Sequence, residues 1–144
     1  MQGANSIVTY FPTRVVKRIT SDEMDEPLNV AAAREVHAMV RARTGYQWVP
    51  QVYSLHDDTI EMQRVFGTTL GEWIQKFPSR ENYLSVAQSA RRAARALIDA
   101  GVYQRDLTPN NIIISEEGQF WVVDFGLVDL LCPMDDRDAA YRAT

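Results

Sequence analysis

Residues 103–111 read Tyr-Gln-Arg-Asp-Leu-Thr-Pro-Asn-Asn, and a second short stretch, Asp124-Phe125-Gly126, follows after one predicted hairpin. The first stretch is a polar loop directly after a long helical pattern, and Asp106 and Asn111 within it are 5 residues apart. The second stretch follows Phe120–Val123, a short run that favours a strand. The local pattern of strand and helix leaves these polar groups unexplained, so they are candidates for carrying chemistry.

Two further polar residues lie in apolar surroundings earlier in the chain. Lys17 is inside Val15–Ile19, an otherwise largely apolar strand pattern, and Glu35 falls on the apolar side of the predicted helix Leu28–Arg43. Each residue alone has an ordinary explanation. A strand lysine often extends along apolar surface to reach water, and a helical glutamate normally faces solvent or pairs along its helix.

Hydrophobic periodicity predicts four strands and one helix before Gly67 and mostly helices after it, with a hinge near Gly67. Pro12 separates two runs of β-branched and aromatic residues, which favours a hairpin, and Pro27 marks the start of a helix. The elements predicted for this part are strands at Ser6–Phe11 and Thr13–Ile19, a helix at Leu28–Arg43, and strands at Gln51–Leu55 and Thr59–Val65.

Two helices and a second hairpin are predicted for the rest of the chain, with a turn at Glu116-Glu117-Gly118. The elements predicted here are helices at Leu70–Lys76 and Glu81–Ala100, strands at Asn111–Ser115 and Gln119–Val123, and a short helix at Pro133–Thr144. In the long helix, helical spacing predicts a buried stripe of Tyr83, Leu84, Ala87, Ala90, Ala94, Leu97 and Ile98.

Taken in order and spacing, these residues resemble the signature set of protein kinases: a strand lysine, a helix glutamate, an Arg-Asp-Leu-x-x-x-Asn catalytic loop and Asp-Phe-Gly. The chain is similar to the protein-kinase-like superfamily over roughly residues 1–130. The resemblance implies an α+β, protein-kinase-like bilobal fold in a single minimal domain, residues 1–144. It implies a small β-rich N-lobe of about residues 1–66 and a truncated helical C-lobe of about residues 67–144.

The same resemblance implies roles for the polar residues. Lys17 would contact the α- and β-phosphates of ATP, held in place by an ion pair with Glu35. Asn111 and Asp124 would supply oxygen ligands to Mg²⁺, a hard ion that prefers such ligands. Asp106 would orient the acceptor hydroxyl and take its proton.

The resemblance also implies a binding slot for the base. Met62 falls at the gatekeeper position, and Gln63 to Val65 form the hinge that hydrogen-bonds adenine. Arg105 would hold the catalytic loop near Asp124. The apolar slot around the base is expected to consist of Val8, Val15, Ile113 and Val123.

Some positions depart from the ordinary kinase pattern. The phosphate loop before the lysine has one glycine, Gly3, and this loop and Asp106-Leu107-Thr108 resemble the small kinase of the KEOPS tRNA-modification complex. Gln104 stands where ordinary kinases usually have histidine, and Thr108 where Ser/Thr kinases usually carry lysine. Because 18 residues follow Gly126, we expect neither an ordinary activation segment nor a large helical C-lobe.

The composition narrows the class of protein. The 144-residue chain has a formal net charge of -4, which argues against nucleic acid or an acidic membrane as a partner. Arg91, Arg92 and Arg95 share one helix, a pattern more typical of a solvated face than of an RNA site. The one cysteine, Cys132, cannot form an internal disulfide, and no signal or membrane-spanning segment is expected, so the sequence predicts a cytoplasmic protein.

The sequence therefore predicts ATP- and Mg²⁺-dependent phosphoryl transfer to a serine or threonine hydroxyl of a protein, with this chain itself among the acceptors. The alternatives are a pseudokinase that regulates a protein partner and an ATPase that serves a larger complex. A small-molecule phosphotransferase of the aminoglycoside type is less favoured. The catalytic loop of that class is similar to His-Gly-Asp, whereas this chain has Gln104-Arg105-Asp106 there. A small C-lobe would also expose apolar surface, so a dimer or a heteromeric partner is expected.

Overall fold

A computed structural model describes residues 5–22, 25–104, 107–126 and 128–130 of the chain. The first elements are the strands β1 (Asn5–Tyr10) and β2 (Arg14–Ser21), the helix α1 (Leu28–Arg43) and the strands β3 (Val52–His56) and β4 (Thr59–Gln63). They are followed by β5 (Thr68–Thr69), α2 (Leu70–Lys76), α3 (Arg80–Asp99), β6 (Val102–Gln104), a 3₁₀ turn (Pro109–Asn111), β7 (Ile112–Ile114), β8 (Phe120–Val122) and β9 (Val128–Leu130).

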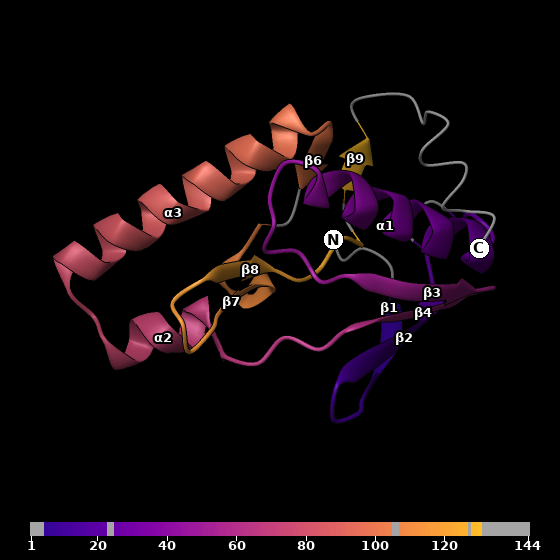
Figure 1. Cartoon of the computed structure of the whole chain (residues 1–144), viewed down its shortest axis with the longest axis horizontal. Helices are drawn as coiled ribbons and strands as arrows, with labels where there is room; N and C mark the ends of the chain where they lie inside the picture. The colour runs from indigo at the N-terminus through magenta and orange to yellow at the C-terminus, as the bar shows by residue number, and fades with distance from the viewer. Residues whose placement is uncertain (1–4, 23–24, 105–106, 127, 131–144) are drawn as a thin grey trace.

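The first four strands form one antiparallel sheet in the order β1-β2-β4-β3, and α1 packs against it (Figure 1). In the register of this sheet, Lys17 of β2 lies opposite Val8 of β1 and Ile60 of β4. Pro27 precedes the first turn of α1, where its missing N–H costs nothing. The side of α1 that faces the sheet is rich in small and apolar residues, and Glu35 is buried among them.

The second half of the chain contains two smaller sheets, β5-β7-β8 and β6-β9. Ser79 caps the N-terminus of α3, and its hydroxyl oxygen accepts a hydrogen bond from the backbone N–H of Asn82 at 3.0 Å. From there α3 runs toward β6, and its N-terminal turns project away from the rest of the molecule (Figure 1).

The segment between α1 and β3 connects the two halves. The hydroxyl of Tyr46 donates to the carbonyl oxygen of Phe120 at 2.6 Å, and the N–H of Val122 donates to the carbonyl oxygen of Trp48 at 3.0 Å. The rings of Trp48 and Trp121 lie 5.3 Å apart. These contacts hold the β7–β8 hairpin beside the four-stranded sheet. Their shared core includes Ile19, Val36, Met39, Ile60, Leu97, Val102, Val122 and Phe125.

The α+β fold class is confirmed, and the predicted helices and strands that fall on described residues lie within two residues of their expected ends. β5, β6 and β9 were not predicted, because runs of two or three residues carry no periodic pattern. The helix predicted at Pro133–Thr144 lies outside the described residues. The division into lobes of residues 1–66 and 67–144 stays a prediction.

The predicted buried stripe of α3 is confirmed at Leu97 and wrong for most of its other residues. Tyr83, Leu84 and Ile98 are exposed, and the buried residues of this helix are Ala93 and Leu97. The C-terminal turns of α3 lie near β6 and β8, whereas its N-terminal turns extend away from both (Figure 1). Amphipathic spacing identifies the apolar side of a helix, but it does not specify what covers that side.

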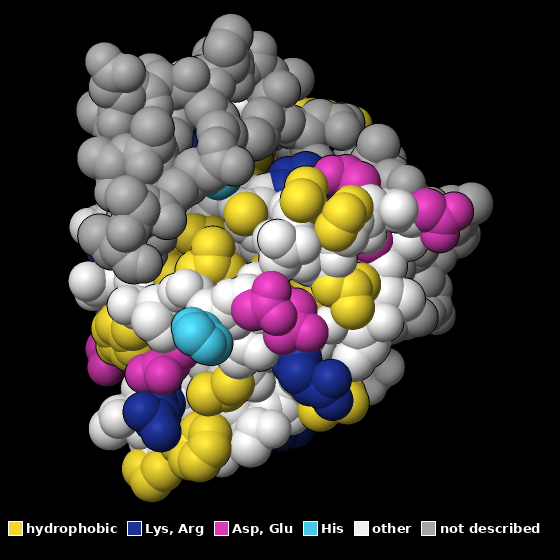
Figure 2. Space-filling model, turned by 90° about the vertical axis from the view of Figure 1, so that its right-hand side faces the viewer, with side chains coloured by type: hydrophobic (Ala, Val, Ile, Leu, Met, Phe, Trp, Pro, Cys, Tyr) yellow, Lys and Arg dark blue, Asp and Glu magenta, His cyan; other side chains and the backbone are white. Residues whose placement is uncertain are grey.

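Apolar side chains reach the surface in several places. On the face shown in Figure 2, they are interspersed with charged side chains. Phe77, Tyr83 and Leu84 are exposed where α2 leads into α3.

In the part of the chain that the structure describes, no helix combines the length and the hydropathy that a bilayer span requires.

Candidate functional site

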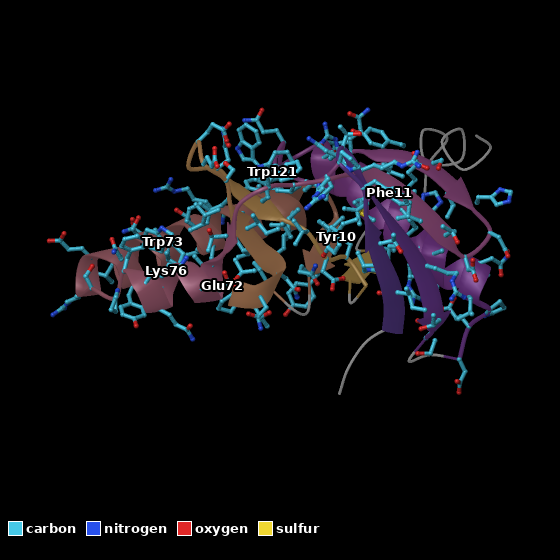
Figure 3. All side chains as sticks on the ribbon, turned by 90° about the horizontal axis from the view of Figure 1, so that it is seen from below. Tyr10, Phe11, Glu72, Trp73, Lys76 and Trp121 are labelled. Carbon is cyan, nitrogen blue, oxygen red and sulfur yellow. The ribbon has the colours of Figure 1, made fainter. Side chains whose placement is uncertain are left out.

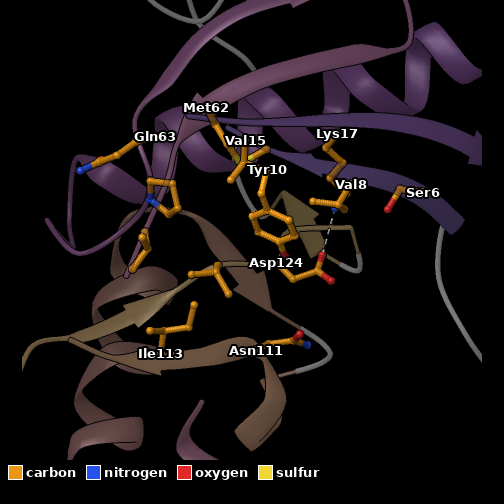
Figure 4. Close-up of a pocket in the computed structure, with 13 residues that line it drawn as sticks. Ser6, Val8, Tyr10, Val15, Lys17, Met62, Gln63, Asn111, Ile113 and Asp124 are labelled. Atoms are coloured by element: carbon orange, nitrogen blue, oxygen red, sulfur yellow. Dashed lines mark hydrogen bonds and ion pairs between the residues drawn. The ribbon is translucent and has the colours of Figure 1, made fainter. Parts of the chain in front are cut away.

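Lys17, Glu35 and Asp124 come together although they lie on separate elements. The Nζ atom of Lys17, on β2, is 2.8 Å from Oε2 of Glu35 on α1. It is also 3.4 Å from Oδ1 of Asp124, which follows β8 (Figure 4). Strand alternation turns Lys17 to the same face of the sheet as Val15 and Ile19. The side chains of Lys17 and Glu35 are only 11% and 3% exposed, so neither is a surface residue with a solvated charge.

Burial and mutual attraction determine the charge states of this cluster. Burial alone would lower the pKa of Lys17, but the carboxylates of Glu35 and Asp124 outweigh it and raise that pKa above its ordinary value. Burial raises the pKa of Glu35, and the neighbouring Lys17 offsets only part of this effect. The lysine therefore stays charged throughout the physiological pH range.

The Asp124-Phe125-Gly126 segment is held by contacts on both sides. The N–H of Gly126 donates to Oδ1 of Asp124 at 2.9 Å, so the aspartate makes an Asx-type turn as well as its contact with Lys17. The side-chain amide of Gln104 donates to the backbone carbonyl of Asp124. Gln104 thus supports this segment from the position at which ordinary kinases carry a histidine.

The charged cluster borders a cavity of about 210 Å³ between the four-stranded sheet and the β7–β8 hairpin (Figure 4). The predicted site residues that line it are Lys17, Met62, Gln63, Val65, Asn111, Ile113 and Asp124, together with Val8, Val15 and Val123 of the predicted apolar slot. Glu35 lies behind Lys17 and is not among the lining residues. Gly3, Arg105 and Asp106 lie outside the described residues.

Three residues that line the cavity were not predicted: Ser6, Tyr10 and Pro50. Ser6 and Tyr10 are each two residues from Val8 on β1, so all three side chains share one face of the strand. The prediction that Val8 lines the slot could therefore have identified the other two. Pro50 precedes β3 and carries no comparable signal. Its place in the wall depends on the path of the chain after α1.

The oxygen groups at the cavity fit a magnesium ion. Asp124 and Asn111 both line it, and the side chain of Asp124 is about half exposed. No set of three His, Cys, Asp or Glu side chains suited to a metal occurs among the described residues. Mg²⁺ is commonly bound by one or two protein oxygens plus water and substrate phosphates, so this sparse donor set suits it better than Ca²⁺ or Zn²⁺.

Two solved structures share the fold of this chain. The chain is similar to the WbdD structure with the kinase inhibitor LY294002 (17% identity, TM-score 0.68), which covers 90% of this chain and 32% of WbdD. It is also similar to the ADP/Mg²⁺-phosphoaspartate complex of Rio2 kinase from Chaetomium thermophilum (14% identity, TM-score 0.60, 97% of this chain and 54% of Rio2). These identities support the kinase-like fold alone.

One curated relative shares a short segment with this chain. A putative CBL-interacting protein kinase 27 from Oryza sativa subsp. japonica is 46% identical over an alignment of 50 residues, which covers 30% of this chain and 12% of the rice protein. The chain therefore spans between about an eighth and about half of these proteins.

The family assignment comes from a match over nearly the whole chain. The ABC1 atypical kinase-like domain matches residues 5–141. This match confirms the protein-kinase-like superfamily that the sequence motifs indicated, and it supports phosphoryl transfer as the class of reaction. This chain belongs to the ABC1 atypical kinase-like domain family.

Proposed function

We propose that this chain binds ATP with Mg²⁺ and transfers the γ-phosphoryl group to a serine or threonine hydroxyl of a protein. The observation that carries the proposal is the position of Lys17, which is held by Glu35 and Asp124 and also lines a cavity with apolar walls. A fixed cation at one end of an apolar slot suits a ligand with a flat base and an anionic tail.

The phosphates are the first part of this ligand. Lys17 binds α- and β-phosphate oxygens, and Gly3 is the phosphate-loop glycine that the kinase resemblance implies. Glu35 is a positioning residue, because it contacts Lys17 at 2.8 Å but does not line the cavity. The ion pair keeps the flexible lysine side chain in one place, which lowers the entropy cost of binding.

The metal is the second part. Asp124 and Asn111 hold Mg²⁺, whose charge, when it is bound, offsets that of the phosphates. The structure of Rio2 kinase that resembles this chain contains ADP and Mg²⁺, which supports an adenine nucleotide together with Mg²⁺ as the ligands here. The contacts of the Asp124 side chain with Lys17 and with the N–H of Gly126 both involve Oδ1, so Oδ2 is the oxygen atom that turns toward the metal.

The transfer itself requires a base and a held nucleotide. Asp106 accepts the proton of the acceptor hydroxyl as the hydroxyl oxygen attacks the γ-phosphorus, and Arg105 holds the loop that carries Asp106. The bond from the γ-phosphorus to the β,γ-bridging oxygen breaks, and ADP leaves. The backbone of Gln63 and Val65 binds the edge of adenine, and Met62 closes the inner end of the slot.

A protein acceptor is supported by the 50-residue similarity to a rice protein kinase. This chain's own serine and threonine residues are included among the acceptors, and the site of action is the cytoplasm. Thr108 supplies no cation beside the transferred phosphoryl group, so slow transfer is expected. Because of Thr108, the experiment below also tests two alternatives to a protein kinase. One is an ATPase, and the other is a nucleotide-binding module that acts through a protein partner.

The test is incubation with ATP labelled at the γ-phosphate and Mg²⁺, with and without casein as a generic acceptor. Protein-bound label and free phosphate are followed together. The wild type is expected to label protein, and Asp106→Asn is expected to lower that labelling about 100-fold or more, because a general base contributes at least this much. Asp99→Asn, an exposed carboxylate at the end of α3, is the matched control and should label like wild type.

Each other result overturns a stated part of the proposal. Free phosphate without protein label replaces the kinase with an ATPase. If the protein shows no bound label, releases no free phosphate and has no ATP-induced shift in melting temperature, it is a module that binds a protein partner and not an enzyme. Asp124→Asn provides a second variant whose side chain is about half exposed, and it should remove the Mg²⁺-dependent part of that shift while the protein stays folded.

A further inference from the structure

Tyr10 belongs to the wall of the cavity, although no sequence motif points to it. It ends β1, lies opposite Val15 of β2, and Val15 lies opposite Met62 of β4. All three side chains line the cavity, so they form one row across three strands. Val15 is two residues from Lys17, or about 7 Å along the strand, which places this row beside the cation rather than over it.

The ring of Tyr10 protrudes instead of packing into the core. The residue is 64% exposed, and the ring projects from β1 into the space between the four-stranded sheet and the β7–β8 hairpin (Figure 4). Figure 3 likewise shows Tyr10 where the four-stranded sheet meets the part of the chain that contains β8. A large aromatic ring at the opening of a cavity offers a flat apolar surface to a ligand.

Arg64 holds the ring of Tyr10 in this position. Its guanidinium lies 5.2 Å from the centre of the Tyr10 ring and 4.6 Å from that of Phe66. Nη1 of Arg64 also donates to the carbonyl oxygen of Phe11 at 2.9 Å. The arginine therefore links the end of β1 to the segment after β4, and its charge attracts the ring through a cation–π contact.

We propose that Tyr10, positioned by Arg64, stacks on the nucleobase and forms the outer wall of the base slot. This inference rests on the proposed nucleotide site and adds the residue that recognises an aromatic base there. The apolar side chains of Val15, Ile113 and Val123 provide the inner part of the same slot. Because stacking on an aromatic ring is tolerant of base identity, Tyr10 selects for a nucleoside but not for adenine over guanine.

A ligand series separates the base from the phosphates. The affinities of ATP, adenosine and inorganic tripolyphosphate are measured in Mg²⁺ by competition against a fluorescent ATP analogue. Tyr10→Ala is expected to weaken ATP and adenosine by the same factor, about tenfold, and to leave tripolyphosphate unchanged. Tyr10→Phe keeps the ring and should bind all three ligands like wild type.

Two further variants complete the test. Tyr53→Ala removes an exposed tyrosine of β3 that does not line the cavity and should bind all three ligands like wild type. Arg64→Ala leaves the ring but removes the group that positions it, so it should weaken adenosine and ATP by a smaller factor than Tyr10→Ala and spare tripolyphosphate.

The contrary outcomes are distinguishable. If wild type binds ATP and Tyr10→Ala binds adenosine equally well, the stacking role is wrong and the nucleotide site stands. If Tyr10→Ala weakens tripolyphosphate as much as adenosine, Tyr10 acts by shaping β1 and the stacking role is again wrong. If wild type binds none of the ligands, the proposed function itself fails.

Discussion

Lys17 and Glu35 are charged residues buried at positions where the strand and helix patterns call for apolar ones. Moving two such charges out of water costs several kcal/mol each, and their attraction repays this only at close range. The 2.8 Å contact, with Asp124 as a second partner at 3.4 Å, provides that range. Since a buried pair adds little net stability over an apolar pair, a role in binding explains it better than a role in folding.

Replacing Lys17 should therefore destabilise the folded protein, by an amount that depends on pH. Lys17→Met is expected to lower the free energy of unfolding at pH 7 by about 3–5 kcal/mol, because Glu35 remains buried without its cation. The pKa of Glu35, already raised by burial, rises further in this variant. When a carboxyl group has a raised pKa in the folded state, the folded protein loses stability as pH increases above the ordinary pKa of that group, which is 4.5 for Glu35. Urea unfolding should therefore show a smaller deficit at pH 4.5 than at pH 7.

The double variant Lys17→Met/Glu35→Leu is the control for this prediction. It removes both charges and should recover most of the lost stability at pH 7, since no unpaired carboxylate remains. An equal deficit for Lys17→Met at both pH values would show that lost packing, and not the charge of Glu35, destabilises the variant.

The strand β5 depends on a close approach of two backbones. The sequence marks Gly67 as a boundary between the β-rich and helix-rich halves, and the structure adds a steric requirement there. A Cβ atom on Gly67 would lie 2.2 Å from the carbonyl oxygen of Ile114 and 2.8 Å from Cγ2 of Ile113. Thr68 and Thr69 of β5 pair with these same two residues of β7. Glycine is thus needed where the chain enters the small sheet.

Gly67→Ala is expected to lower the free energy of unfolding by about 1–3 kcal/mol, because a paired backbone strand cannot move away from the new methyl group. Gly118→Ala is the matched comparison. Its Cβ would meet nothing within 4 Å, but its φ of +87° lies in the left-handed region, so a loss of about 1 kcal/mol comes from the backbone alone. Denaturant unfolding measures both, and a smaller loss for Gly67→Ala than for Gly118→Ala would contradict the steric argument.

At the scale of the whole molecule, the end of α2 and the start of α3 leave apolar side chains in water. The rings of Trp73 and Phe77 lie 5.6 Å apart, and Phe77, Tyr83 and Leu84 are each more than half exposed. The helix that carries two of them projects beyond the four-stranded sheet (Figure 1). Clustered exposed apolar residues of this kind favour association with another protein surface.

This chain is therefore expected to self-associate as its concentration rises, through the α2–α3 end. Sedimentation velocity over a concentration series measures this. Replacing Phe77, Tyr83 and Leu84 together by serine should reduce the association without lowering the melting temperature, because these side chains are not buried. The matched triple variant replaces three exposed apolar residues of other elements, Ile7, Val30 and Tyr53, and should associate like wild type. Equal behaviour of the two triple variants would contradict an interface at this end.

Much of the local structure could be predicted from the sequence. The bounds of α1 follow from Pro27 and the helical spacing after it, and the β7–β8 hairpin follows from the turn at Glu116 to Gly118. These features depend on backbone preferences over a few residues. The kinase-like superfamily also followed from sequence, because the lysine, glutamate, loop and aspartate occur in a fixed order along the chain.

Tertiary structure alone decided which of these residues meet and which faces are covered. The contact of Lys17 with Asp124 joins residues 107 positions apart, and the place of Tyr10 in the cavity depends on pairing across three strands. The same limit explains the error over α3, whose apolar side is covered near Leu97 and exposed at Leu84. A periodic pattern fixes the direction of a side chain within its own element, whereas its burial depends on which other surface packs there.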